Sequence, residues 1–161
     1  ANNIIFSTAK LNMGSGNSGM LVTKVKKQMM DAVSETDLAI IDGSPGIGCP
    51  VIASISGVDM VLIVTEPTIS GINDLVRIIE TAEKFHVKIS VCINKYDINI
   101  KNSEQIEVLC NKLNLPLTTV VPYDINAVKA INDGMTIVDI DCASGQAVKQ
   151  VFDETIKMLF S

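Results

Sequence analysis

The chain has 161 residues, of which 47% are hydrophobic, and a formal net charge of −5. This length suits one domain, and apolar runs such as "MVLIV" at 60–64 are far shorter than the roughly 18 residues of a membrane span. The lysines are scattered, with only "KVKK" at 24–27 clustered, so we do not expect a nucleic-acid surface.

The first notable segment is "LNMGSGNSGM" at 11–20, which places Gly14, Gly16 and Gly19 in a GxGxxG spacing before an apolar-periodic stretch. One reading is a dinucleotide-binding turn, in which Asp42 follows the last glycine at the distance expected for a ribose ligand. The other reading is a turn that leads into a helix. The spacing permits both.

Four short apolar runs follow, each ending in polar or turn residues. Because they are apolar on both alternations, they predict strands of a parallel sheet that is covered on both faces. The four runs are "LAIID" (38–42), "MVLIVT" (60–65), "ISVCIN" (89–94) and "LTTVVP" (117–122).

Helical periodicity lies between and after these runs, at 69–84, 103–113 and 144–160. Thr68 or Ser70 is a candidate N-cap for the first helix, and Ser103 for the second. Alternating strands and helices indicate βαβ units, so we predict one α/β domain over 1–161, a parallel sheet flanked by helices on both faces.

The end of the first predicted strand carries a possible phosphate-related motif. Four apolar residues, then Asp42, then Gly46 give the pattern hhhhDxxxG. Such a carboxylate can orient Mg²⁺ through water, and such a glycine can turn its N–H toward a γ-phosphate. The same letters, "DGSPG", are also typical of a tight turn.

The third strand ends in "NKYD" at 94–97, which matches NKxD. In that motif the Asn94 amide and the Asp97 carboxylate would read a purine edge, while the Lys95 stem packs along the ring. The alternative is a solvated polar loop.

The fourth strand ends in "PYD", where Pro122 and Tyr123 could lie beside a base. Asp124 could accept a hydrogen bond from ribose, but capping the following helix is the favoured role. His86, the single histidine, is expected on the surface near a helix C-terminus.

The four cysteines, at 49, 92, 110 and 142, show neither a CxxC pair nor the spacing of a zinc or iron-sulfur site. They predict buried small residues of a protein from a reducing compartment, the cytoplasm. The first residues, "ANNII", lack the features of a signal peptide.

Taken together, residues 39–99 resemble the MinD/ParA superfamily of P-loop ATPases. The motifs "DGSPGIGCPVIAS", "TEPTISG" and "NKYD" are similar to the branch with an inserted ferredoxin domain, which also carries the name cobyrinic acid a,c-diamide synthase. The resemblance extends from about Ser7 to about Asp141. "GNSGMLV" at 16–22 matches a family segment that is a turn into a helix after the ferredoxin insert.

The resemblance implies a C-terminal portion of such an ATPase, because the 161 residues contain no KGGxGKT phosphate loop. Switch I and the cluster-binding insert would be missing too. It implies that Asp42 orients Mg²⁺ and Gly46 senses the γ-phosphate. Asn94 would contact the adenine amino edge, beside Lys95, and the adenine and ribose side would be formed by Pro122, Tyr123 and Asp124. The roles of Cys49 and Asp97 stay open.

The function implied is an ATP- and Mg-dependent switch that forms a homodimer as the full-length protein, with an iron-sulfur or electron-transfer partner. The iron-sulfur cluster would sit only in the missing insert, and the 161-residue chain alone would not hydrolyse ATP. Three alternatives remain: a dinucleotide-binding domain built on Gly14, Gly16 and Gly19, a nucleotide-free interaction module, and an ATP-dependent amidotransferase domain. The last rests on the family name alone.

Overall fold

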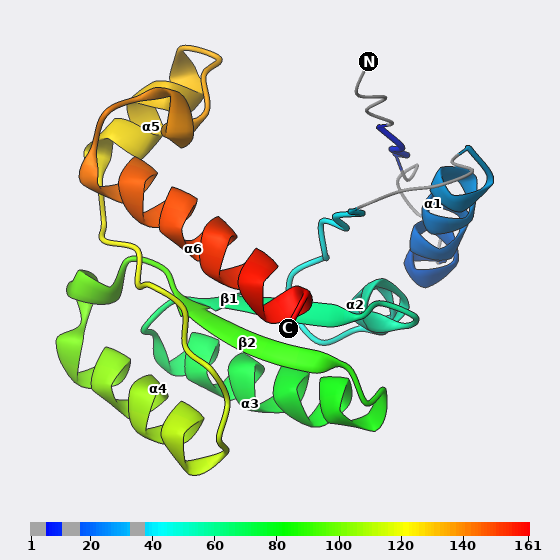
Figure 1. Cartoon of the computed structure of the whole chain (residues 1–161), viewed down its shortest axis with the longest axis horizontal. Helices are drawn as coiled ribbons and strands as arrows, with labels where there is room; N and C mark the ends of the chain where they lie inside the picture. The colour runs from blue at the N-terminus through cyan, green and yellow to red at the C-terminus, as the bar shows by residue number, and fades with distance from the viewer. Residues whose placement is uncertain (1–5, 11–16, 33–37) are drawn as a thin grey trace. The chain divides into compact units, whose positions relative to one another are not determined.

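The computed structural model describes residues 6–10, 17–32 and 38–161. The chain forms two compact units, Ala1–Val58 and Asp59–Ser161, which are described separately here. Figure 1 shows their helices and strands.

The first unit contains two helices, α1 (Ser18–Ala32) and α2 (Cys49–Ile55), that pack against each other. Gly19 allows the close approach, because a Cβ there would lie 3.2 Å from the Cβ of Cys49. At the other end, the Lys26 ammonium donates hydrogen bonds to the carbonyls of Ala53 and Ser54, each at 3.2 Å, and of Ser56. A cation at this position satisfies the unpaired carbonyls of the α2 C-terminus.

The predicted strand at 38–42 is wrong, because these residues have no strand structure and Ile40 is 74% exposed. A strand requires backbone hydrogen bonds from a neighbouring strand. No described residue pairs with this segment in that way. Apolar composition alone therefore does not make it a strand.

The second unit contains the sheet. Strands β1 (Met60–Thr65) and β2 (Lys88–Ile93) pair in parallel, with Met60 opposite Lys88 and Thr65 opposite Ile93. Segment 117–121 runs parallel to the other side of β2 through two isolated bridges, Val91 to Leu117 and Asn94 to Val121. The predicted fourth strand thus forms as bridges and not as a continuous ladder.

The helices of the second unit cover both faces of this sheet. Figure 1 shows α3 and α4 on one side of β1 and β2, and α6 on the other. The elements are α3 (Ile69–Lys84), η1 (Tyr96–Ile98), α4 (Ile100–Lys112), α5 (Ile125–Asn132), η2 (Ile137–Asp139) and α6 (Ala143–Leu159).

Two helix starts illustrate how local chemistry sets these boundaries. Thr68 caps α3 as predicted, because its hydroxyl accepts a hydrogen bond from the Gly71 N–H. The predicted cap at Ser103 is wrong, since Asn99 caps α4 and Ser103 lies buried within it, donating to the Tyr96 carbonyl at 2.7 Å. Helix α4 consequently begins three residues before the predicted start.

The core follows the alternation of β2. On one face of β2, Cys92 packs with Val121 and with Ala147 and Val151 of α6. Val91 and Ile93 point to the opposite face and are completely buried. Cys92, Cys110 and Cys142 are buried as predicted, whereas Cys49 is exposed at the first position of α2. Within the described ranges, no helix has the length and apolar character needed to cross a membrane.

Candidate functional site

The loops that follow β1, β2 and segment 117–121 meet at one edge of the sheet, which we call the carboxyl edge. The Asn94 N–H donates to the Thr65 carbonyl at 2.8 Å, and the Tyr96 N–H donates to the Val121 carbonyl at 3.1 Å. The first bond extends the pairing of β1 and β2 by one residue, and the second ties the start of η1 to the segment 117–121. In this way Asn94 is placed between the loops of the two neighbouring strands.

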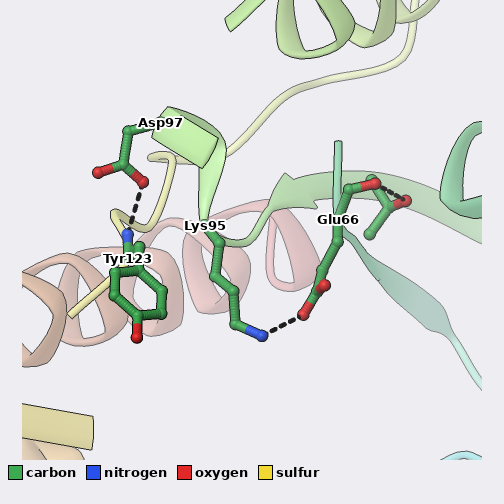
Figure 2. A network of polar contacts seen from close by, with 5 residues as sticks. Glu66, Lys95, Asp97 and Tyr123 are labelled. Atoms are coloured by element: carbon green, nitrogen blue, oxygen red, sulfur yellow. Dashed lines mark hydrogen bonds and ion pairs between the residues drawn. The ribbon is translucent and has the colours of Figure 1, made fainter. Parts of the chain in front are cut away.

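The "NKYD" turn is tied directly to the "PYD" turn. The Asp97 carboxylate accepts a hydrogen bond from the Tyr123 backbone N–H at 2.7 Å, as Figure 2 shows. An ionised acceptor makes this a charge-assisted bond. Asp97, whose role the sequence left open, therefore acts within the chain as a link between two loops.

Lys95 has a left-handed backbone, with φ of +54°, which costs a non-glycine residue about 1–2 kcal/mol. Its ammonium lies 2.7 Å from the Glu66 carboxylate, and both side chains are 40% exposed. A pair this exposed contributes about 0–1 kcal/mol, too little to offset the backbone strain. The backbone hydrogen bonds on either side, of Asn94 and Tyr96, are what hold the turn.

The Lys95 side chain and the Tyr123 ring extend from their loops in the same direction in Figure 2, and the Asp97 carboxylate points toward the Tyr123 backbone. Tyr123 is 51% exposed. The carboxyl edge thus presents an alkyl stem and an aromatic ring on one side, and Asn94 lies directly before Lys95 in the turn.

The Asp124 carboxylate accepts hydrogen bonds at the starts of two helices. One carboxylate oxygen accepts from the Asn126 N–H at 2.9 Å, and the other from the Ser144 hydroxyl at 3.0 Å and its N–H at 3.4 Å. The Asn126 N–H and, to a smaller extent, Ser144 hold the pKa of this carboxyl below its ordinary 3.8. The capping role favoured by the sequence matches these contacts, which join the starts of α5 and α6.

The loop after β1 contains residues that the sequence analysis did not single out. Glu66 is the ion-pair partner of Lys95. Its backbone is enclosed by Gly71, where a Cβ would overlap the Glu66 carbonyl oxygen, and the Thr65 hydroxyl donates to the Gly71 carbonyl at 3.1 Å. The motif "TEPTISG" indicated a loop at a strand end. It did not indicate that Glu66 would pair with Lys95.

Asp42 and Gly46 belong to the first unit, and both are exposed. Gly46 has a φ of +85°, and no atom would lie within 4 Å of a Cβ placed there. The left-handed backbone at this position favours glycine, and the space on its Cβ side is open. Asp42 lies in the irregular segment that precedes this glycine.

The glycines of the GxGxxG spacing are only partly described. Gly14 and Gly16 lie outside the described residues, and Gly19 is the second residue of α1, packed against Cys49. Its role in the structure is helix packing. His86 is exposed after α3 as predicted, and the described residues contain no group of three His, Cys, Asp or Glu side chains that could hold a metal ion.

Comparisons with known proteins place these features in context. No family model matches the chain. An uncharacterised protein of Methanocaldococcus jannaschii is 29% identical over 90% of this chain and 48% of its own length. An uncharacterised ATP-binding protein of the same organism is 28% identical over 80% of this chain and 48% of its own length. The chain therefore spans about half the length of these relatives.

Among solved structures, the MinD cell division protein of Aquifex aeolicus matches with a TM-score of 0.68 and 21% identity. The match covers 86% of this chain and 61% of the MinD chain. Similarity at this level of identity establishes the fold. The chain accordingly has the α/β fold of MinD, in which helices flank a parallel sheet.

Proposed function

We propose that this chain carries the adenine and ribose side, and the switch II segment, of an ATP-binding switch protein. The observation that carries the proposal is the hydrogen bond between Asp97 and the Tyr123 backbone, which holds the "NKYD" and "PYD" turns together at the carboxyl edge. Ligands of open parallel sheets bind at this edge. The ATP-binding relative and the MinD fold support the same class of ligand.

Each proposed site residue of the second unit then has a defined task. The Asn94 amide carries both a donor and an acceptor, which suits the amino edge of adenine. The Lys95 stem and the Tyr123 ring offer apolar surfaces for the faces of the base, and Pro122 shapes the adjoining wall. Asp124 completes the ribose side by fixing the starts of α5 and α6.

Asp42 and Gly46 are assigned to the phosphate chemistry. Mg²⁺ supplies positive charge to the phosphate oxygens when it is bound with ATP. The exposed Asp42 carboxylate can orient such an ion through water, and the unhindered backbone of Gly46 can reorient toward a terminal phosphate. The Asp42 carboxylate makes no hydrogen bond or ion pair within the described residues, so it fits this task.

The remaining functions are proposed for the full-length protein. The 161 residues hold no phosphate loop, and the chain spans about half of its relatives. We assign the phosphate loop, switch I and an iron-sulfur insert to the other half. In the full-length protein, ATP would drive homodimerisation, and hydrolysis would be coupled to an iron-sulfur or electron-transfer partner.

Measurements of ATP hydrolysis and equilibrium binding by the purified 161-residue chain test this proposal. We expect hydrolysis at background level and a dissociation constant of about 1 mM or weaker, equivalent to about −4 kcal/mol, because the phosphate contacts are missing. Robust turnover by this chain would contradict the division of the site.

A pair of variants tests the base contact. Asn94→Ala should remove the residual ATP binding, whereas Asn111→Ala, an exposed residue of α4, should not change it. Equal binding by both variants would show that the carboxyl edge is not where the base lies.

A further inference from the structure

Resting on the proposed function, we infer that Glu66 is a positioning residue, which fixes the Lys95 side chain as one wall of the base site. The link is the ion pair of 2.7 Å between the Lys95 ammonium and one Glu66 carboxylate oxygen. Glu66 comes from the loop after β1 and Lys95 from the loop after β2. The pair therefore joins two neighbouring loops of the carboxyl edge.

The position of Glu66 is itself fixed by its surroundings. Its carbonyl accepts a hydrogen bond from the Thr68 N–H at 2.8 Å, in the residue that caps α3. The first turn of α3 closes over this carbonyl so tightly that only glycine fits at Gly71. The Glu66 backbone is thereby set by a long helix, and its side chain starts from a fixed point.

The ion pair does not hold the backbone of Lys95. Hydrogen bonds from the Asn94 N–H to Thr65 and from the Tyr96 N–H to Val121 hold the left-handed turn on both sides. The four-carbon stem of lysine is flexible when its ammonium is unpaired. What Glu66 adds is a fixed end point for this stem, so that the stem lies along the site with a defined direction.

Figure 2 shows what this direction achieves. The Lys95 stem extends the same way as the Tyr123 ring, and the carboxylate of Glu66 receives its ammonium. A stem and a ring that extend the same way can contact one adenine base together. Without Glu66, the stem would lose rotational order before binding, and the ligand would have to restore it.

The test uses the 161-residue chain and adenosine, which probes the base site without phosphate contacts. Glu66→Gln keeps the shape and removes the charge, and Glu80→Gln on the exposed side of α3 is the matched control. We expect Glu66→Gln to weaken adenosine binding about three- to fivefold at an unchanged melting temperature. Glu80→Gln should bind as the unsubstituted chain does.

Two readouts separate positioning from a structural role. Carbon-13 relaxation of the Lys95 Cε should show faster motion in Glu66→Gln, and this measurement needs no ligand. In a Lys95→Met background, Glu66→Gln should cause no further loss of adenosine binding. An additional loss in that background, or an unchanged Lys95 relaxation, would overturn the inference.

The proposed function can fail separately. If the unsubstituted chain does not bind adenosine, both the base site and this role of Glu66 are overturned. If it binds adenosine and Glu66→Gln binds equally well, only the role of Glu66 is overturned.

Discussion

The carboxylate of Asp124 shows how a single side chain can join two helices. It accepts hydrogen bonds at the starts of two helices, α5 and α6, whose first residues are 18 positions apart in the sequence. Each helix N-terminus carries unpaired N–H groups and a partial positive charge, so one anion stabilises both. Its neighbour Tyr123 is held in turn by Asp97.

This arrangement predicts a pH dependence. Because the folded chain lowers the pKa of Asp124 below 3.8, its contribution to stability is present above that pH and is lost as the pH falls toward the folded-state value. Asp124→Asn should therefore be less stable than the unsubstituted chain near neutral pH, and the difference should shrink below about pH 4. Urea unfolding at a series of pH values measures it.

Asp153→Asn, an exposed residue of α6, is the control and should show no such difference. A gap between Asp124→Asn and the unsubstituted chain that stays constant down to about pH 2.5 would contradict the assignment of the effect to this carboxyl.

Gly71 gives a second prediction at the scale of one residue. A methyl group there would overlap the Glu66 carbonyl oxygen and crowd the Thr68 hydroxyl. Since both neighbours are fixed in the α3 cap, we expect Gly71→Ala to lower the free energy of unfolding by about 1–3 kcal/mol. Denaturant titration should give less than about 0.5 kcal/mol for Gly43→Ala, whose nearest contact would be 3.9 Å away.

At the scale of elements, the pairing of α1 with α2 depends on a buried cation. Lys26 is 8% exposed, and burial lowers its pKa. Its ammonium donates to three carbonyls at the end of α2. A short helix of seven residues has little stability of its own, so this contact should matter to it.

We therefore expect Lys26→Met to destabilise α2 by about 1–3 kcal/mol, because it leaves buried carbonyls without donors. Hydrogen exchange of the amides in 49–58 is the measurement, and they should exchange faster. Lys27→Met, an exposed neighbour on the same helix, should exchange as the unsubstituted chain does. Equal protection in both variants would show that Lys26 is dispensable.

Some elements could be predicted from the sequence because their signals are local. Strand 60–65 and helix 69–84 lie within the predicted bounds, and the Thr68 cap acts within three residues. Helix α2 was missed, because the preceding "DGSPG" is typical of a turn and the helix itself has only seven residues. The strand expected at 38–42 failed for the opposite reason, since it depends on a partner that its own letters cannot reveal.

The residues of the proposed site divide in the same way, into positions that local patterns predict and contacts that depend on distant parts of the sequence. The positions of Asn94 and Pro122 after strands follow from pattern, so their common edge could be predicted. The bond between Asp97 and Tyr123 spans 26 residues and depends on how two turns approach each other. The partner of Lys95 likewise comes from a loop 29 residues earlier, which no spacing rule indicates.

For the whole molecule, the alternation of strands and helices was sufficient to predict the α/β class, which the MinD fold confirms. The chain forms two compact units, and one domain over 1–161 stays a prediction. Three of the four predicted strand ends, and all proposed base-contacting residues, belong to the second unit, and Asp42 and Gly46 belong to the first.

The internal link between the turns of Asp97 and Tyr123 has a consequence for how a ligand would be received. Fixing the backbone of a loose loop costs about 1–2 kcal/mol of conformational entropy per residue. Here folding has already met that cost for both turns, because their hydrogen bonds lie within the chain. The two turns are therefore preorganised, and under the proposed function weak affinity for a nucleotide would reflect absent phosphate contacts and not the cost of ordering these turns.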